Sequence, residues 1–205
     1  DLTRQSFLRE YPVGVIPNGI DLTRFRPTQS GVRERLGIPA EKRLVLGVAN
    51  VWDERKGLSD FLKLAELLGG GAQVLLVGLS EKQKQALPAN VLGVTRTESV
   101  RELAELYTAA DVFLNPTYED NFPTTNLEAL ACGTPVVTYR TGGSPESVTD
   151  SCGAVIPQGD LNAAAELALH GRWSPAACTA QAAKYDKQRR FQEYLSLYDR
   201  LFHQH

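Results

Sequence analysis

Two acidic residues in the segment NPTYEDNFPTTNLEALACGTPVV have the clearest potential for chemistry. Glu128 stands among apolar neighbours, where a carboxylate is too polar to be simple core filling. It can accept hydrogen bonds from sugar hydroxyls, as acidic residues do for the ribose in dinucleotide sites. Asp120, eight positions earlier, can do the same for a second sugar. The alternative is a capping Asp120 and a solvated Glu128, and the bare spacing leaves both open.

Two adjacent cations, Arg55 and Lys56, lie in the segment NVWDERKG, which follows a long apolar run. They stand just before a predicted helix, and the positive N-terminal end of a helix disfavours cations unless an anion is present. This arrangement predicts a diphosphate ligand. The alternative is a solvated loop in which the cations pair with Asp53 and Glu54.

Backbone groups near these side chains extend the predicted site. A helix is expected to begin near Pro123, a favoured first-turn residue, so that the amides of Thr124 and Thr125 face the space above the sheet. A further polar segment, YRTGGSPES, holds Gly142 and Gly143, which permit a close backbone approach. We predict a plain turn there.

The elements that must position these residues alternate between short β-branched or leucine-rich runs and helical patterns, which is typical of βαβ units on a parallel sheet. The sequence therefore predicts an α/β, Rossmann-like parallel sheet with helices on both faces. Ligands of such sheets bind at the carboxyl ends of the strands, where the candidate residues stand. The predicted strands are Val13–Ile16, Arg43–Ala49, Gln73–Val77, Val91–Val94, Val112–Asn115, Pro135–Tyr139 and Ala154–Ile156.

Two helices and a helical tail complete the predicted architecture. Residues 58–68 and 99–109 each place apolar side chains on one helical face, with Thr97 or Ser99 as the cap of the second helix and Gly69–Gly71 as the stop of the first. The tail, residues 161–205, is expected to be helical with a break near residues 173–175. Its apolar stripe can either cover the sheet or dock against a neighbour. The stripe comprises Phe191, Tyr194, Leu197, Tyr198 and Leu201, with Arg190 beside it.

Length and composition limit the classes of protein. With 205 residues, 42% hydrophobic residues and a formal charge of -2, we expect one soluble domain over residues 1–205 that attracts neither nucleic acid nor a membrane surface. The three separated cysteines form no metal or redox motif and favour the reducing cytoplasm. No run is long and apolar enough for a membrane span, and the N-terminus lacks an export signal. Because the chain contains no methionine, we expect a piece of a longer protein.

The segment from Asp120 to Val137 resembles glycosyltransferase family 4 (group 1), whose C-terminal domain carries an acidic-x7-Glu motif running into a helix. Here the motif spans Asp120 to Glu128 and continues as EALACGTPVV. The resemblance extends over VIPNGIDLTRFRP, GVANVWDERKGL, LLVG, ELAELYTAADVFLNPT and TGGSPESV, in the expected order. It implies one half of a GT-B fold, the half that binds a nucleoside-diphosphate sugar.

The resemblance also implies roles for individual residues. Glu128 would bind the ribose, Asp120 the transferred sugar, and Arg55 and Lys56 the diphosphate. Glu119 would be a substitute for Asp120, because the first acid of the family is usually Glu. The family Arg lies where this chain has Val51, so Arg55 replaces it by proximity. Backbone around the distal phosphate would come from Asn121, Phe122, Thr124 and Thr125, and Arg96 would stack on the base.

The implied reaction transfers a hexosyl unit from the nucleotide to an acceptor hydroxyl with retention at the anomeric carbon. No metal or other cofactor is expected, because preorganised cations and helix amides can stabilise the leaving diphosphate. The resemblance places the acceptor site, a catalytic histidine and any peripheral membrane contact in an N-terminal domain outside this chain, so we expect it to be nearly inactive alone. The strings TRTES and EDNFPTTN are similar to those of bacterial surface-polysaccharide transferases. A GT-B-type sugar-nucleotide epimerase and a degenerate, non-catalytic nucleotide-binding module remain alternatives.

Overall fold

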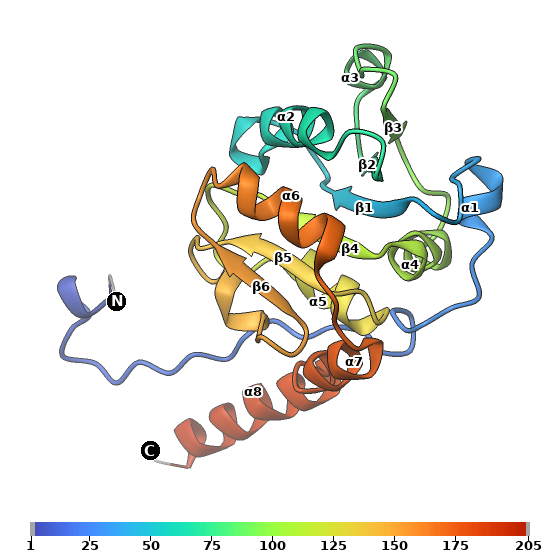
Figure 1. Cartoon of the computed structure of the whole chain (residues 1–205). Coiled ribbons are helices and arrows are strands. Elements are labelled where there is room, and N and C mark those ends of the chain that lie inside the picture. Colours follow the sequence, from blue (N-terminus) through green and yellow to red (C-terminus); the bar gives the residue numbers. More distant parts are fainter. Residues whose placement is uncertain (1–2, 204–205) are drawn as a thin grey trace.

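A six-stranded parallel sheet forms the centre of the computed structural model, which describes residues 3–203 (Figure 1). The strand order is β3-β2-β1-β4-β5-β6. In β1, Val45 pairs with Val74 of β2 on one side and with Val112 of β4 on the other. The predicted fold class is confirmed. The strands are β1 (Arg43–Val48), β2 (Ala72–Val77), β3 (Val91–Val94), β4 (Val112–Asn115), β5 (Val136–Tyr139) and β6 (Gly153–Ile156).

One predicted strand, Val13–Ile16, is wrong. Within residues 3–203 this segment has no partner strand, and it runs away from the sheet in Figure 1, with Val15 80% exposed. The chain first pairs at Ile20, whose backbone forms an isolated bridge with Asp186 in the C-terminal tail. An apolar run predicts a strand only where a sheet edge is within reach, and none is available here.

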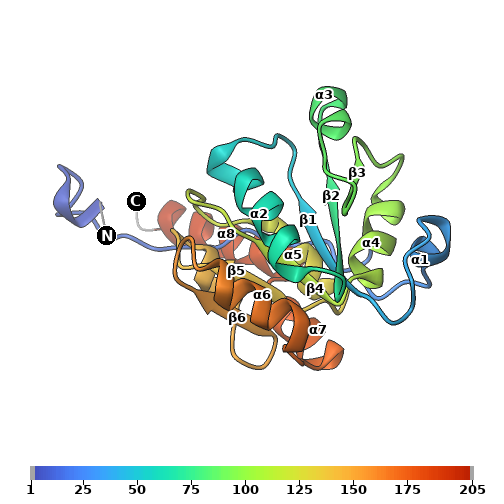
Figure 2. The same cartoon turned by 45° about the horizontal axis from the view of Figure 1, so that its top comes forward.

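Helices cover both faces because the strand residues alternate between them. In β1, Leu44 and Leu46 belong to one buried cluster, with side chains of α4, α5 and α7, whereas Val45 belongs to the other, with α2 and α6. Figure 2 shows α2 and α6 together on one face. The α-helices are α1 (Val32–Arg35), α2 (Leu58–Leu68), α3 (Glu81–Gln85), α4 (Val100–Ala109), α5 (Thr124–Ala131), α6 (Leu161–His170), α7 (Pro175–Ala183) and α8 (Lys187–Phe202). The short 3₁₀ helices are η1 (Thr3–Gln5), η2 (Glu54–Lys56) and η3 (Ser144–Ser147).

The predicted helix ends rest on identifiable caps. Ser99 caps α4, since its side chain accepts a hydrogen bond from the Glu102 amide, and the Glu102 carboxylate accepts one from the Glu98 amide. The capping residue is therefore Ser99 and not Thr97. Gly69 ends α2 with φ +54°, a left-handed value that glycine adopts at little cost.

The helical tail forms as predicted, with the break between α6 and α7. Of the two alternatives for its apolar stripe, covering the sheet is wrong, because α8 has no buried residue and Tyr198 is 63% exposed. Figure 1 shows α8 running out beyond the sheet and its covering helices. Among the described residues, no helix combines the length and apolar character needed to cross a membrane.

Candidate active site

A cavity of about 420 Å³ opens at the carboxyl edge of the sheet, over the ends of β1 and β4. Seven of the ten residues singled out in the sequence line it. Its other lining residues come from the end of β1 and the loop that follows it, from β4, from the segment between β4 and α5, and from α4. The seven are Arg55, Lys56, Asp120, Phe122, Thr124, Thr125 and Glu128.

The three remaining candidates lie elsewhere. Glu119 and Asn121 line a smaller adjoining cavity of about 240 Å³, together with Asn18. Arg55, Asp120 and Phe122 line both cavities, so the two meet at these residues. Arg96 is exposed in the loop between β3 and α4 and lines neither cavity, and its contact with a base stays a prediction.

The cation and the acid at the centre of the site face each other directly. The Lys56 ammonium donates to the Asp120 carboxylate over 2.6 Å, and both side chains are largely buried, 26% and 17% exposed. The second Asp120 oxygen accepts a hydrogen bond from the Phe122 amide at 3.2 Å. The fold thus brings together residues that are 64 positions apart in the sequence.

Arg55 behaves differently from Lys56. Its guanidinium lies 3.6 Å from the Asp53 carboxylate and is half exposed, as the solvated-loop alternative predicted. Asp53 also caps the short η2 helix by accepting from the Lys56 amide at 2.9 Å. Arg55 is therefore the more exposed cation of the two, and an exposed pair of this kind contributes little to stability. Val51, which occupies the place of the family Arg, lines the large cavity without offering a charge.

The two loops that carry Lys56 and Asp120 are bound tightly to each other. The Arg55 carbonyl accepts from the Tyr118 amide at 2.8 Å and from the Thr117 hydroxyl at 3.2 Å. At Gly57, which has φ +73°, a β-carbon would lie 2.3 Å from the Pro116 carbonyl oxygen. Only glycine permits this approach, so the distance between the loops is set by the backbone.

A buried carboxylate supports the same loop from below. Asp60 of α2 accepts hydrogen bonds from the hydroxyls of Tyr118 and Tyr139, at 2.8 and 2.7 Å. Burial, together with the hydrogen bond to Asp60, raises the pKa of both phenols, so both stay protonated donors. Sequence reasoning missed Asp60. The available signal was its place between the apolar residues of a helix that is otherwise buried on that side.

Glu128 is held by a buried tyrosine. The Tyr107 hydroxyl donates to one Glu128 oxygen at 2.9 Å, and Glu128 lines the cavity. Burial raises the pKa of the Glu128 carboxyl, and the hydrogen bond from Tyr107 opposes that rise. Burial also raises the pKa of Tyr107 well above its ordinary value, so Tyr107 remains a donor at neutral pH. From the sequence, Tyr107 belongs to the apolar face of the helix predicted over residues 99–109, and its contact with Glu128 came only from the structure.

The Tyr107→Phe substitution should raise the pKa of Glu128 further. Phe keeps the edge-on ring packing with Phe113, 5.4 Å between centroids, and removes only the hydroxyl that stabilises the charged carboxylate. We expect a loss of about 1–2 kcal/mol in the free energy of unfolding, because a buried acceptor loses its donor. A ¹³C titration of the Glu128 carboxyl measures the pKa. An unchanged value would contradict the assigned role of the hydroxyl.

The start of α5 is fixed by a buried polar network that sequence reasoning also missed. The Asn126 side-chain oxygen accepts a hydrogen bond from the Asn115 side-chain amide at 2.9 Å. The Asn126 side-chain nitrogen donates to the hydroxyls of Ser144 and Ser147 at 3.0 and 3.2 Å. All four side chains are buried. Pro123 is the N-cap of α5 and not its first helical residue, so Thr124 and Thr125 supply the first amides, which have no intrahelical acceptor.

These groups divide into an anion-binding part and a hydroxyl-binding part. Lys56, Arg55 and the start of α5 can hold an anion, and Asp120 and Glu128 can accept from hydroxyls. Among the described residues, no cluster of three or more His, Cys, Asp or Glu is placed to hold a metal ion. The three cysteines are free and buried.

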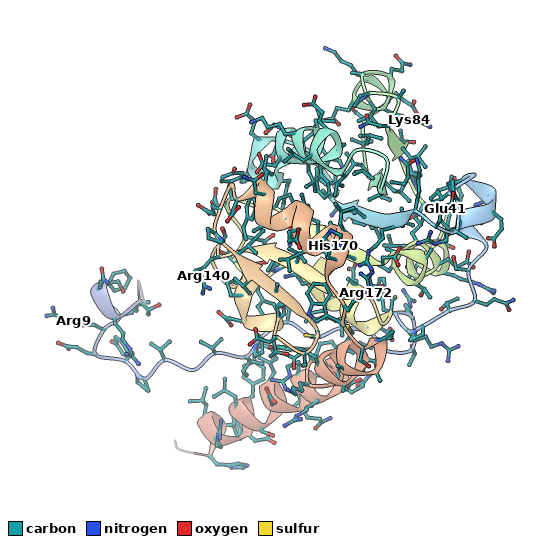
Figure 3. All side chains as sticks on the ribbon, viewed as in Figure 1. Arg9, Glu41, Lys84, Arg140, His170 and Arg172 are labelled. Atoms are coloured by element: carbon teal, nitrogen blue, oxygen red, sulfur yellow. The ribbon has the colours of Figure 1, made fainter. Side chains whose placement is uncertain are left out.

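The histidines lie away from this site. His170, labelled in Figure 3, is exposed at the end of α6. The carbonyl of the next residue, Gly171, accepts from Arg43 at the beginning of β1, which places His170 at the opposite edge of the sheet. His203 follows α8, and His205 lies outside the described residues.

Comparisons with known proteins agree with this arrangement. A family model described as "Glycosyl transferases group 1" matches residues 42–170. The D-inositol 3-phosphate glycosyltransferase of Corynebacterium jeikeium is 36% identical over 157 residues, covering 66% of this chain and 37% of that protein. Its namesake from Xylanimonas cellulosilytica is 32% identical over 196 residues, covering 83% and 46%. The chain therefore spans less than half the length of these relatives.

Two solved structures share the fold. Sucrose-phosphate synthase from Thermosynechococcus elongatus has a TM-score of 0.84 at 26% identity, over 99% of this chain and 56% of that one. Anabaena HepE, solved in complex with UDP-glucose, has a TM-score of 0.77 at 20% identity, over 91% and 57%. The matched family segment contains both cations and both acids of the large cavity. The chain is thus a member of the group 1 glycosyltransferases.

Proposed function

We propose that this chain is the donor-binding part of a retaining glycosyltransferase, which transfers a hexosyl unit from a nucleoside-diphosphate sugar to an acceptor hydroxyl. The observation that carries this proposal is the single cavity that contains Lys56, Asp120, Glu128 and the start of α5. A nucleotide sugar presents the two matching chemistries, an anionic diphosphate and two sets of hydroxyls. Glu128 is assigned to the ribose, and Asp120 to the transferred sugar.

Charge stabilisation is the catalytic contribution that we assign to these residues. As the bond to the anomeric carbon breaks, negative charge grows on the leaving diphosphate. Lys56, Arg55 and the amides of Thr124 and Thr125 lie around the cavity where that charge would develop. The helix amides are fixed donors that stabilise a transition state without reorganisation, and the two cations add positive charge, so we propose that no metal is required.

The acceptor is proposed to bind to another part of the full-length protein, which would also account for little turnover by this chain alone. The relatives named above are at least twice as long as the segment they share with this chain. We propose retention at the anomeric carbon from the family resemblance, and a surface polysaccharide as the acceptor from the strings TRTES and EDNFPTTN. The names of the relatives point to other acceptors, inositol phosphate in particular, which a full-length assay would compare.

Calorimetric titration with UDP, GDP and ADP in EDTA tests donor binding. UDP is the first probe, because HepE shares the fold and was solved with UDP-glucose. We expect one nucleotide to bind in EDTA. Lys56→Met should weaken the sugar-bearing form of that nucleotide, such as UDP-glucose, about 30-fold, since a hydrogen bond to a charged group contributes about 2 kcal/mol. Lys63→Met, which removes an exposed lysine of α2, is the matched control and should bind as the parent does.

Two results would contradict the proposal. Binding that requires a divalent metal would exclude the metal-independent site. Equal affinity of the parent and Lys56→Met for the sugar-bearing nucleotide would place its diphosphate elsewhere. The epimerase alternative predicts that a nucleotide sugar is converted to its epimer without acceptor, which NMR of the sugar detects. A degenerate module predicts binding in the full-length protein without transfer.

A further inference from the structure

Lys56, which we propose binds the phosphate, has a carboxylate partner within the protein itself. Lys56 donates to Asp120 at 2.6 Å, and the remaining Asp120 oxygen accepts from the Phe122 amide. Hydrogen bonds from the Tyr118 amide and the Thr117 hydroxyl to the Arg55 carbonyl hold the two loops together. Only the long Lys56 side chain can turn toward another partner.

The formal charges of the residues that line the large cavity sum to zero. Arg55 and Lys56 contribute two positive charges, and Asp120 and Glu128 contribute two negative ones. While Asp120 holds Lys56, a bare nucleoside diphosphate is therefore attracted only by Arg55 and the first amides of α5. If the phosphate takes Lys56, it leaves a largely buried carboxylate without its cation, which is unfavourable.

We propose that Asp120 makes this site select a sugar-bearing nucleotide over the spent diphosphate, by exchanging Lys56 for sugar hydroxyls. The inference rests on the proposed donor site. When a sugar is attached, its hydroxyls donate to the Asp120 oxygen that Lys56 releases, and the ammonium passes to the phosphate. When the sugar has been transferred, Asp120 recovers Lys56, and the diphosphate loses its cation.

The position of Asp120 between the two cavities supports this exchange. The large cavity holds the groups assigned to ribose and phosphate, and the smaller cavity continues past Asp120 to Asn18, Glu119 and Asn121. Carboxylate and amide groups of this kind are partners for hydroxyls. A ligand that fills both cavities must pass the Asp120 carboxylate, whereas a nucleotide without a sugar fills only the first.

The Asp120→Asn substitution tests the exchange because the two ligands should respond with opposite signs. The Asn oxygen still accepts from the Phe122 amide, so the loop keeps its turn, but Lys56 is released and one negative charge is lost. We expect UDP and inorganic pyrophosphate to bind about 3- to 10-fold more tightly than to the parent. UDP-glucose should bind no more tightly, so its advantage over UDP disappears. Glu54→Gln, which removes an exposed acid next to Arg55, is the control and should leave the ratio unchanged.

The outcomes of these titrations distinguish failure of the exchange from failure of the nucleotide site. Unchanged or weaker UDP and pyrophosphate binding in Asp120→Asn would overturn the exchange, because Asp120 would then only position Lys56. An equal gain in Glu54→Gln would assign the effect to net charge and would overturn it too. Tighter pyrophosphate binding without nucleotide binding to either protein would retain the exchange and reject the nucleotide site. No binding of any probe at millimolar concentration would reject both.

Discussion

Replacing Glu128 by Gln should weaken nucleotide binding about 50-fold and leave the protein as stable as before, or slightly more stable. The loss in affinity follows because the carboxylate is assigned to the ribose hydroxyls, and charge-assisted hydrogen bonds contribute roughly 1.5–3 kcal/mol. The Gln side chain has the same shape as Glu, and its oxygen can still accept the hydrogen bond from the Tyr107 hydroxyl. A residue that serves only the fold would not show this opposition between binding and stability.

The pH dependence follows from the same carboxyl. Burial raises the pKa of Glu128, so the free protein is destabilised as pH rises through that pKa and the carboxylate forms. The Gln variant lacks this cost at neutral pH. A nucleotide needs the charged form, and its affinity for the parent should therefore fall as pH decreases through the raised pKa. Titrations at several pH values should show this decline in the parent and not in Glu128→Gln.

Urea unfolding and calorimetry of the two proteins measure both quantities. Asp199→Asn, an exposed acid on α8, controls for the loss of one negative charge. A Gln variant that binds UDP as well as the parent would remove Glu128 from the site. A variant that loses several kcal/mol of stability would show that the charged carboxylate is part of the fold itself.

Local signals in the sequence predicted most of the fold because they act locally. The β1 run has a side chain for each face of the sheet, and Ser99 stands three residues before the amide that it caps. The segment Val13–Ile16 has the same apolar character as a strand, but strand formation needs a partner, which no local pattern specifies. The contact partner of the apolar stripe on α8 could not be predicted for the same reason, since periodicity predicts an apolar face and not what covers it.

The candidate site divides in a similar way. Residue types and their position after strands predicted that Lys56, Asp120 and Glu128 would meet at one edge, because parallel strands all end there. Their partners could not be predicted. Tyr107 looks like a core residue on the buried face of α4, and nothing near it in the sequence indicates the carboxylate 21 positions away. The pairing of Lys56 with Asp120 likewise depends on how closely two loops approach, which Gly57 determines in three dimensions.

Gly142→Ala is expected to displace Asp120 and cost about 3 kcal/mol of stability. Gly142 has φ +48°, and a β-carbon there would lie 1.9 Å from the Asp120 carbonyl oxygen. Left-handed backbone costs an alanine about 1 kcal/mol, and the clash adds to that unless the Asp120 loop shifts. The sequence predicted a plain turn whose glycines permit a close backbone approach, and in the structure the Gly142 backbone approaches the loop that carries Asp120. A shifted Asp120 would no longer meet the hydroxyls of the transferred sugar, and we expect the affinity for the nucleotide sugar to fall about 30-fold.

Gly70→Ala is the matched control for this effect. Gly70 has open space around its α-carbon and no left-handed φ, so alanine there should change stability by less than about 0.5 kcal/mol. Chemical shifts of the Asp120 and Phe122 amides report whether the loop moves in Gly142→Ala. If these shifts and the affinity match the parent, the two glycines of the TGG turn have no part in placing Asp120. If they change together, the backbone contact at Gly142 sets the position of the carboxylate, and the site depends on a loop that contributes no side chain to it.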